Sequence, residues 1–181
     1  GGMSGRDMET IAQGLCETTE FPYLQNRIGQ VNLLHGMLDK LGVPLVKPAG
    51  GHAVYLDARE YLKNVSEEEY RADTLACLVY GIGGIRTSAI GNMMYAEKDS
   101  QGRILEPSKN DFLRLAIPRN VYMLEHILFV ANTFQKIHKV KDELEHGIEV
   151  AGKFRNDRFD HFDCKLRPVD EKNFERVVKT A

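Results

Sequence analysis

The sequence predicts a mixed α/β chain of the α+β kind, in which helices cover one face of a mostly antiparallel sheet. Two long segments repeat apolar residues every three or four positions, as amphipathic helices do. Between them lie short runs rich in β-branched and aromatic residues, which glycine and proline separate. The predicted order of helix, strands, helix, strands, helix and strand is typical of this architecture.

Two helices are predicted in the N-terminal part of the chain. Residues 4–16 give a short helix, with Ser4 or Asp7 as its N-cap. Residues 23–41 give a helix of about five turns, which ends at Gly42. Its apolar positions have the spacing of one helix face: Leu24, Ile28, Val31, Leu34, Leu38 and Leu41.

The remaining elements alternate between short strands and helices. Strands are expected at 43–46, 53–56, 85–94, 112–117 and 159–166, with a polar hairpin loop at 98–109. Helices are expected at 70–80, 121–140 and 171–179. The acidic run after Ser66 forms the N-terminal signature of the first of these helices.

The composition excludes several classes of function. With 43% hydrophobic and 28% charged residues, and no apolar run of membrane-spanning length, no membrane span is expected. A net charge of −2 gives no basic field for nucleic acid. No export signal opens the chain, and its three scattered cysteines fit a reducing, cytoplasmic compartment. No cysteine or histidine pair has metal-ligand spacing, so no metal site is predicted.

Arg114 is the most informative charged residue. It interrupts the apolar run 112–117, where a charge is costly unless it is paired. Alternation along a strand places Arg114 on the face opposite Leu113 and Leu115. A guanidinium in this position requires a carboxylate, which can belong to the protein or to a ligand. Both alternatives stay open on the residues alone.

Other motifs carry weaker signals. His161 can be a pH-active group or a partly exposed histidine in a terminal segment. The glycines at 81–84 lack the spacing of a dinucleotide site, and residues 48–52 are interpreted as a plain turn. Arg86 can bind an anion or simply lie at the start of a strand.

Five segments resemble, in the same order, motifs of the tryptophanase and tyrosine phenol-lyase family of β-eliminating lyases. They are GGMSGRDME at 1–9, GGHAVYLDA at 50–58, GIR with IG at 84–91, LRLAIPR at 113–119 and HF at 161–162. The resemblance implies the C-terminal small domain of an aminotransferase-like, pyridoxal-phosphate enzyme of fold type I. Residues 1–20 would then end the large cofactor-binding domain and linker, and residues 21–181 would form the small domain.

The resemblance also implies roles for four residues. Arg114 matches the arginine that binds the substrate α-carboxylate, and His161 matches a catalytic histidine near the ring of the substrate. Ile90 and Phe162 would form an apolar pocket wall. Around His161 the family has LRHFTAKL, and Asp160 here replaces a basic residue. Residues 167–181 extend beyond the family pattern and have no interpretation from it.

The cofactor itself would be held by another part of the protein. The family's Schiff-base lysine lies in a paired-lysine segment, and no such pair occurs in this sequence. The chain alone is therefore expected to be an inactive fragment without cofactor-binding residues. The complete enzyme would be a cytoplasmic homo-tetramer that uses pyridoxal phosphate and a potassium ion.

Two positions favour tryptophan as substrate, with indole, pyruvate and ammonia as products. Phenol-lyases have arginine in place of Ile90, whose apolar side chain suits an indole ring. His161 also matches the residue that tryptophanases have at this position, whereas residues 5–7 and 57–59 resemble the phenol-lyase motifs more closely. The alternatives are a tyrosine phenol-lyase or other β-eliminating lyase, and a non-catalytic module that binds amino acids or partner subunits.

Overall fold

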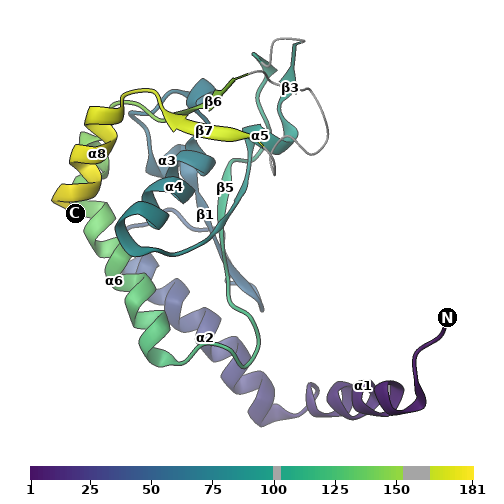
Figure 1. Cartoon of the computed structure of the whole chain (residues 1–181). Helices are drawn as coiled ribbons and strands as arrows, with labels where there is room; N and C mark the ends of the chain where they lie inside the picture. Colours follow the sequence, from purple (N-terminus) through teal and green to yellow (C-terminus); the bar gives the residue numbers. More distant parts are fainter. Residues whose placement is uncertain (100–102, 153–163) are drawn as a thin grey trace.

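The computed structural model (Figure 1) describes residues 1–99, 103–152 and 164–181. It confirms the predicted combination of helices and antiparallel strands. The central sheet is three-stranded and antiparallel, with its strands in the order β1-β5-β2. These strands are β1 (Ala53–Asp57), β2 (Ser88–Ile90) and β5 (Phe112–Ala116).

Three long helices lie on one side of this sheet, the left side in Figure 1. They are α2 (Phe21–Lys40), α4 (Arg71–Gly83) and α6 (Leu124–Val140). The helix α6 packs on both α2 and α4, while α2 contacts β1 and α4 contacts β5. Their apolar faces and the inward side chains of the strands form one core, which includes Leu34, Leu38, Leu56, Leu113, Leu115 and Phe134. Removing this apolar surface from water stabilises the arrangement.

Shorter elements complete the fold around the sheet. They are α3 (Ala58–Tyr61), η1 (Glu67–Glu69), α5 (Asn92–Tyr95), η2 (Lys141–Glu143) and α8 (Glu171–Thr180). Two antiparallel pairs join β3 (Glu97–Lys98) to β4 (Ile104–Glu106) and β6 (Ile148–Ala151) to β7 (Lys165–Pro168). The pair of β3 and β4 agrees with the predicted hairpin. Residues 100–102, at the tip of that hairpin, lie outside the described residues.

The N-terminal helix α1 (Gly5–Glu17) extends away from the rest of the molecule (Figure 1). Of its two predicted caps, Ser4 is used: its hydroxyl accepts a hydrogen bond of 3.2 Å from the backbone N–H of Asp7. The apolar side chains of Met8, Ile11 and Leu15 recur at helical spacing, and each is about half exposed. This apolar stripe therefore has no packing partner among the described residues.

The prediction of one strand over residues 85–94 is wrong. Only Ser88–Ile90 is a strand, and the chain then turns at Gly91 into α5. The reason is Asn92, whose buried side-chain amide bonds the backbone of two segments far away in the sequence. Such long-range contacts override the local β-propensity of the segment.

Other boundaries also differ from the predictions, among them the acidic run after Ser66, which forms the separate helix η1 before α4 begins at Arg71. Residues 43–46 contribute only an isolated bridge, Leu45 to Leu56, because prolines 44 and 48 lack the N–H that a ladder needs. The helix predicted from residue 121 begins at Leu124. Of the strand predicted at 159–166, residues 159–163 lie outside the described residues, and β7 begins at Lys165.

Candidate functional site

The candidate site is the face of the central sheet that the helices leave uncovered. Along β5 the side chains of Leu113 and Leu115 are buried in the core, whereas Arg114 points to the opposite face, as alternation predicts. The register places Arg114 between Tyr55 of β1 and Ser88 of β2. Directly paired residues of antiparallel strands share a face, so these three side chains form one row.

A second row lies next to the first and contains Ile90. In the register, Phe112 of β5 is paired with Asp57 of β1 and with Ile90 of β2. Because Phe112 and Arg114 are two residues apart on one strand, the rows are separated by about 7 Å. The structure thus brings Arg114 and Ile90, two residues that the sequence singled out, to adjacent rows of one face.

A pocket of about 480 Å³ opens beside the second row. Ile90, Phe112 and Tyr95 supply its apolar surface, and the loop between β4 and β5 supplies much of the rest. The other lining residues are Glu97, Glu106, Pro107, Ser108, Lys109 and Asn110. The pocket combines an apolar wall with polar and charged groups at its edge, as small-molecule sites commonly do.

Within the described residues, the Arg114 guanidinium has no protein partner. Its Nε atom is buried without a hydrogen bond, and no described carboxylate forms an ion pair with it. A buried polar N–H without an acceptor is costly, and most such groups in proteins are satisfied. The described residues thus supply no carboxylate for Arg114, which is compatible with the second alternative, a carboxylate that belongs to a ligand.

Aromatic rings extend the open face from β1 to β5. The ring of Tyr55 meets His52 edge to face at a centroid distance of 6.3 Å, and meets Phe112 in the same way at 6.4 Å. Sequence reasoning missed His52 and Tyr55 as site residues. The alternation of β1 could have placed Tyr55 on the open face, but only the register shows that it lies opposite Arg114.

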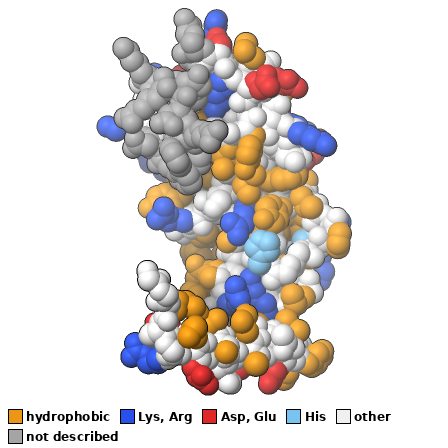
Figure 2. Space-filling view, turned by 90° about the vertical axis from the view of Figure 1, so that its right-hand side faces the viewer, with side chains coloured by type: hydrophobic (Ala, Val, Ile, Leu, Met, Phe, Trp, Pro, Cys, Tyr) orange, Lys and Arg blue, Asp and Glu red, His pale blue; other side chains and the backbone are white. Residues whose placement is uncertain are grey.

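The charge distribution on this side of the molecule suits an anionic ligand. Figure 2 shows hydrophobic and basic side chains, with a histidine, across the middle of this side. Acidic side chains gather at the top and the bottom of the view. A carboxylate that approaches the middle therefore meets mostly apolar or positively charged groups.

Two acidic residues, the half-buried Asp73 of α4 and the buried Asp111, have raised pKa values. Burial raises the pKa of Asp73 to about 7, and the nearby negative charge of Asp111 adds to this shift. Burial also raises the pKa of Asp111, against the opposing charge of Arg59. In the described part of the chain, no three histidine, cysteine or acidic side chains are grouped so that they could hold a metal ion.

The remaining predicted residues are placed as follows. His161 and Phe162 lie outside the described residues. Arg86 is exposed and lines a second pocket of about 360 Å³, between the end of α4 and the helix α6. Across the residues that the structure describes, no helix has the length and apolar character that crossing a membrane requires.

Comparison with known proteins shows extensive similarity to lyases of two specificities. The tyrosine phenol-lyase of Pasteurella multocida is 40% identical over 168 residues, which are 93% of this chain and 36% of that protein. The tryptophanase of Salinibacter ruber is 40% identical over 168 residues, or 93% of this chain and 35% of that protein. A probable beta-eliminating lyase of Trichomonas vaginalis is 43% identical over 151 residues, or 83% of this chain and 33% of that protein.

The chain thus spans about a third of the length of the curated relatives it matches. No family model matches it. The phenol-lyase and the tryptophanase are equally identical to it, so overall similarity does not distinguish tyrosine from tryptophan as substrate. That distinction depends on the pocket residues.

Proposed function

This chain belongs to the tryptophanase and tyrosine phenol-lyase family, and we propose that it forms the C-terminal, substrate-facing part of a lyase that releases indole from tryptophan. Residues 21–181 would be the small domain, and residues 1–20 would lead into it from the cofactor-binding domain. The observation that carries the proposal is the unpaired Arg114 guanidinium beside an apolar pocket.

Arg114 would bind the α-carboxylate of the substrate. Its two terminal nitrogens can donate two parallel hydrogen bonds to one carboxylate, which fixes both the position and the orientation of the amino acid. Aromatic neighbours on the same face limit access of water to this ion pair and strengthen it. Arg114 therefore holds one end of the substrate while the reaction takes place at its Cα and Cβ atoms.

The pocket beside Ile90 would receive the ring that leaves. The spacing of about 7 Å between the rows of Arg114 and Ile90 is comparable to the length of an aromatic amino acid. Ile90 and Phe112 offer apolar contacts to the indole ring. Ile90 itself offers no hydrogen-bond donor, so at this position the pocket wall gains nothing from the hydroxyl group of tyrosine.

The family implies pyridoxal phosphate, which supplies an electron sink for the loss of the Cα proton. The open face fits the substrate carboxylate through Arg114, but the sequence lacks the paired lysines of the family. We therefore assign the cofactor lysine, the phosphate contacts and the potassium site to the rest of the complete protein. By the same resemblance, His161 would act near the leaving ring, with Phe162 in the pocket wall, and the complete protein would be a cytoplasmic tetramer.

Product analysis of the complete enzyme tests this assignment. With tryptophan and tyrosine as competing substrates, indole release should exceed phenol release. Replacing Ile90 with arginine should shift the ratio of the two kcat/KM values towards tyrosine by about tenfold or more, because it adds a donor to the apolar wall. Ile90→Leu is the matched control and should leave the ratio unchanged. An Ile90→Arg enzyme with the wild-type ratio would rule out the pocket assignment.

The alternative hypothesis, a non-catalytic module that binds amino acids, predicts a different experimental result. If the chain binds amino acids by itself, calorimetric titration of the 181-residue chain with tryptophan should give at least millimolar affinity. We expect no measurable heat, because one arginine and a pocket open on one side bury too little of the ligand to offset its loss of freedom. Binding by the isolated chain that Arg114→Gln abolishes would instead favour the module.

A further inference from the structure

One wall of the pocket is a loop that has no regular secondary structure. Residues 107–111 connect β4 to β5, and residues 107–110 line the pocket together with Ile90 and Phe112. A loop of this kind keeps one shape only if its backbone groups find partners elsewhere in the protein. Those partners determine the space that remains for a ring.

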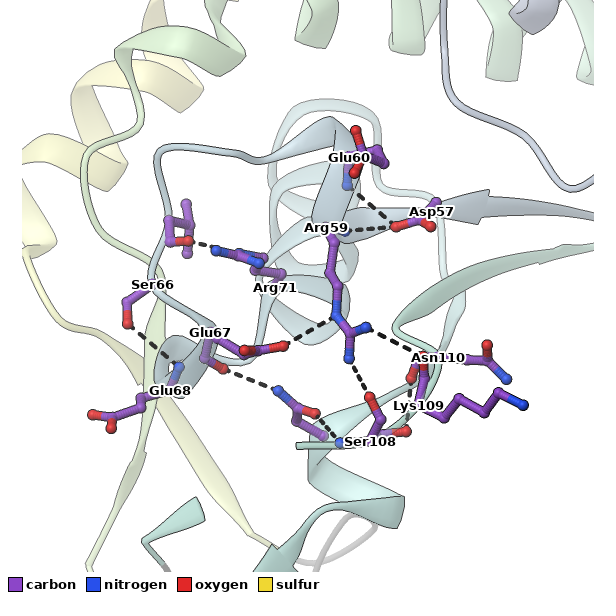
Figure 3. Close-up of polar contacts among 12 residues, drawn as sticks. Asp57, Arg59, Glu60, Ser66, Glu67, Glu68, Arg71, Ser108, Lys109 and Asn110 are labelled. Carbon is purple, nitrogen blue, oxygen red and sulfur yellow. Dashed lines mark hydrogen bonds and ion pairs between the residues drawn. The ribbon is translucent and has the colours of Figure 1, made fainter. Parts of the chain in front are cut away.

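Arg59 of α3 provides the first set of partners. Its terminal nitrogens donate to two successive carbonyls of the loop, to that of Lys109 at 3.2 Å and to that of Ser108. The Nε of the same guanidinium lies 3.1 Å from a carboxylate oxygen of Glu67 in η1. Figure 3 shows Arg59 reaching across from α3 to both the loop and Glu67. One planar guanidinium therefore joins three segments of the chain.

Asn92 makes a second connection between the same segments. Its side-chain oxygen accepts a hydrogen bond of 2.8 Å from the backbone N–H of Ser108, and its nitrogen donates to the carbonyl of Glu67 at 3.1 Å. Asn92 is fully buried, so these bonds are not exchanged with water. The residue also lies two positions after Ile90, which links the loop directly to the apolar wall.

The orientation of Arg59 is itself fixed by the turn from β1. The carboxylate of Asp57 accepts hydrogen bonds from the backbone N–H groups of Arg59 at 2.9 Å and of Glu60 at 3.2 Å, and so caps α3. Asp57 also lies in the pocket row of the sheet, opposite Phe112. The sheet, α3 and the loop thus form one connected unit behind the pocket.

We propose that Arg59 and Asn92 are positioning residues that set the width of the leaving-group pocket by holding loop 107–110 against Ile90 and Phe112. The proposal rests on the function proposed above, since it assigns a role within that site. Neither residue is among those that line the pocket. Their effect is on which ring fits, because displacing a pocket wall by a fraction of an ångström changes the contacts of a large ring more than those of a small group.

Steady-state kinetics of the complete enzyme tests the role of Arg59. The substrates are tryptophan, which fills the pocket, and S-methylcysteine, whose leaving group is small. Arg59→Met should raise the KM for tryptophan by about tenfold, with an effect below about twofold on S-methylcysteine. Arg59→Lys keeps the charge but cannot serve two carbonyls and a carboxylate in one plane, so its effect should be intermediate. Arg176→Met is the matched control, since Arg176 is exposed on α8 and should have no effect.

Hydrogen exchange provides a readout that does not depend on activity. In the 181-residue chain, the backbone amide of Ser108 should exchange at least about tenfold faster in Arg59→Met than in the wild type. Equal exchange rates, or equal changes in KM for both substrates, would overturn the positioning role. A wild-type enzyme that acts on neither tryptophan, tyrosine nor S-methylcysteine would instead refute the proposed function, so the two failures are distinguishable.

Discussion

A methyl group at position 91 is incompatible with the place of Asp111. A Cβ atom added to Gly91 would lie 1.7 Å from Oδ1 of Asp111 and 2.9 Å from its Cγ atom. Both residues are buried, and Asp111 is 1% exposed, so neither can move aside without rearranging its neighbours. We expect Gly91→Ala to lower the free energy of unfolding by about 3 kcal/mol, the upper end of the usual cost of overpacking.

The companion variant Asp111→Ala should cost less. Burial raises the pKa of Asp111, and both of its carboxylate oxygens are buried without a hydrogen-bond partner among the described residues. Removing this poorly solvated carboxylate should therefore change the free energy of unfolding by less than about 1 kcal/mol. In the double variant, the new methyl group enters the space that the carboxylate left. We therefore expect a total loss similar to that of Asp111→Ala alone, a favourable coupling of about 3 kcal/mol.

Urea denaturation of the 181-residue chain measures these values. The chain has no tryptophan and seven tyrosines, so circular dichroism and tyrosine fluorescence are suitable probes. Gly36→Ala is the control: a Cβ there meets no atom within 4 Å, and the residue lies inside α2, so it should stabilise the chain by about 0.5–1 kcal/mol. Penalties of Gly91→Ala and Asp111→Ala that simply add in the double variant would refute this reasoning.

Three further predictions follow from single residues. Arg114→Gln should lower the kcat/KM of the complete enzyme by about 100-fold or more, because the α-carboxylate of the substrate would lose its proposed ion pair. The same substitution should not lower the stability of the chain. The pKa of Asp73 is raised from 3.8 to about 7. Between these values the unfolded chain releases the proton that the folded state keeps, so stability falls as pH rises, and Asp73→Asn should be more stable than the wild type by roughly 2 kcal/mol in urea at pH 8. Burial and Asp73 raise the pKa of Cys77 to about 11, so mass spectrometry after thiol alkylation at pH 8 should find the exposed Cys16 modified well before Cys77.

The sequence predicted best those elements whose pattern repeats within themselves. The helix spacing around Leu34 and Leu38 required no knowledge of distant residues, and α2 agrees with it. The alternation at 112–117 placed Arg114 opposite Leu113 and Leu115, and the burial along β5 confirms that placement. Alternation within one strand decides which face a residue occupies, which is why the face of Arg114 could be derived without the fold.

What the sequence could not provide is register, because register joins residues that are far apart in the chain. Nothing in the local pattern states that Tyr55 lies opposite Arg114, or that Phe112 lies beside Ile90. The same limit explains the error at 85–94, where the long-range bonds of Asn92 replace a strand with a turn and a helix. Sequence patterns therefore indicated the separate residues of the site but not the surface that they share.

The contact between Gly91 and Asp111 explains how Ile90 and Arg114 come to share one site. Gly91 directly follows Ile90, and Asp111 precedes β5, the strand that carries Arg114. Because Asp111 occupies the space that a side chain at 91 would need, glycine at this position lets β2 and β5 approach with Asp111 in place. The two residues of the Ile90-Gly91 motif thus have separate structural roles. The isoleucine faces the pocket, and the glycine lets that pocket wall lie close to β5, the strand of the arginine that we propose to bind the substrate carboxylate.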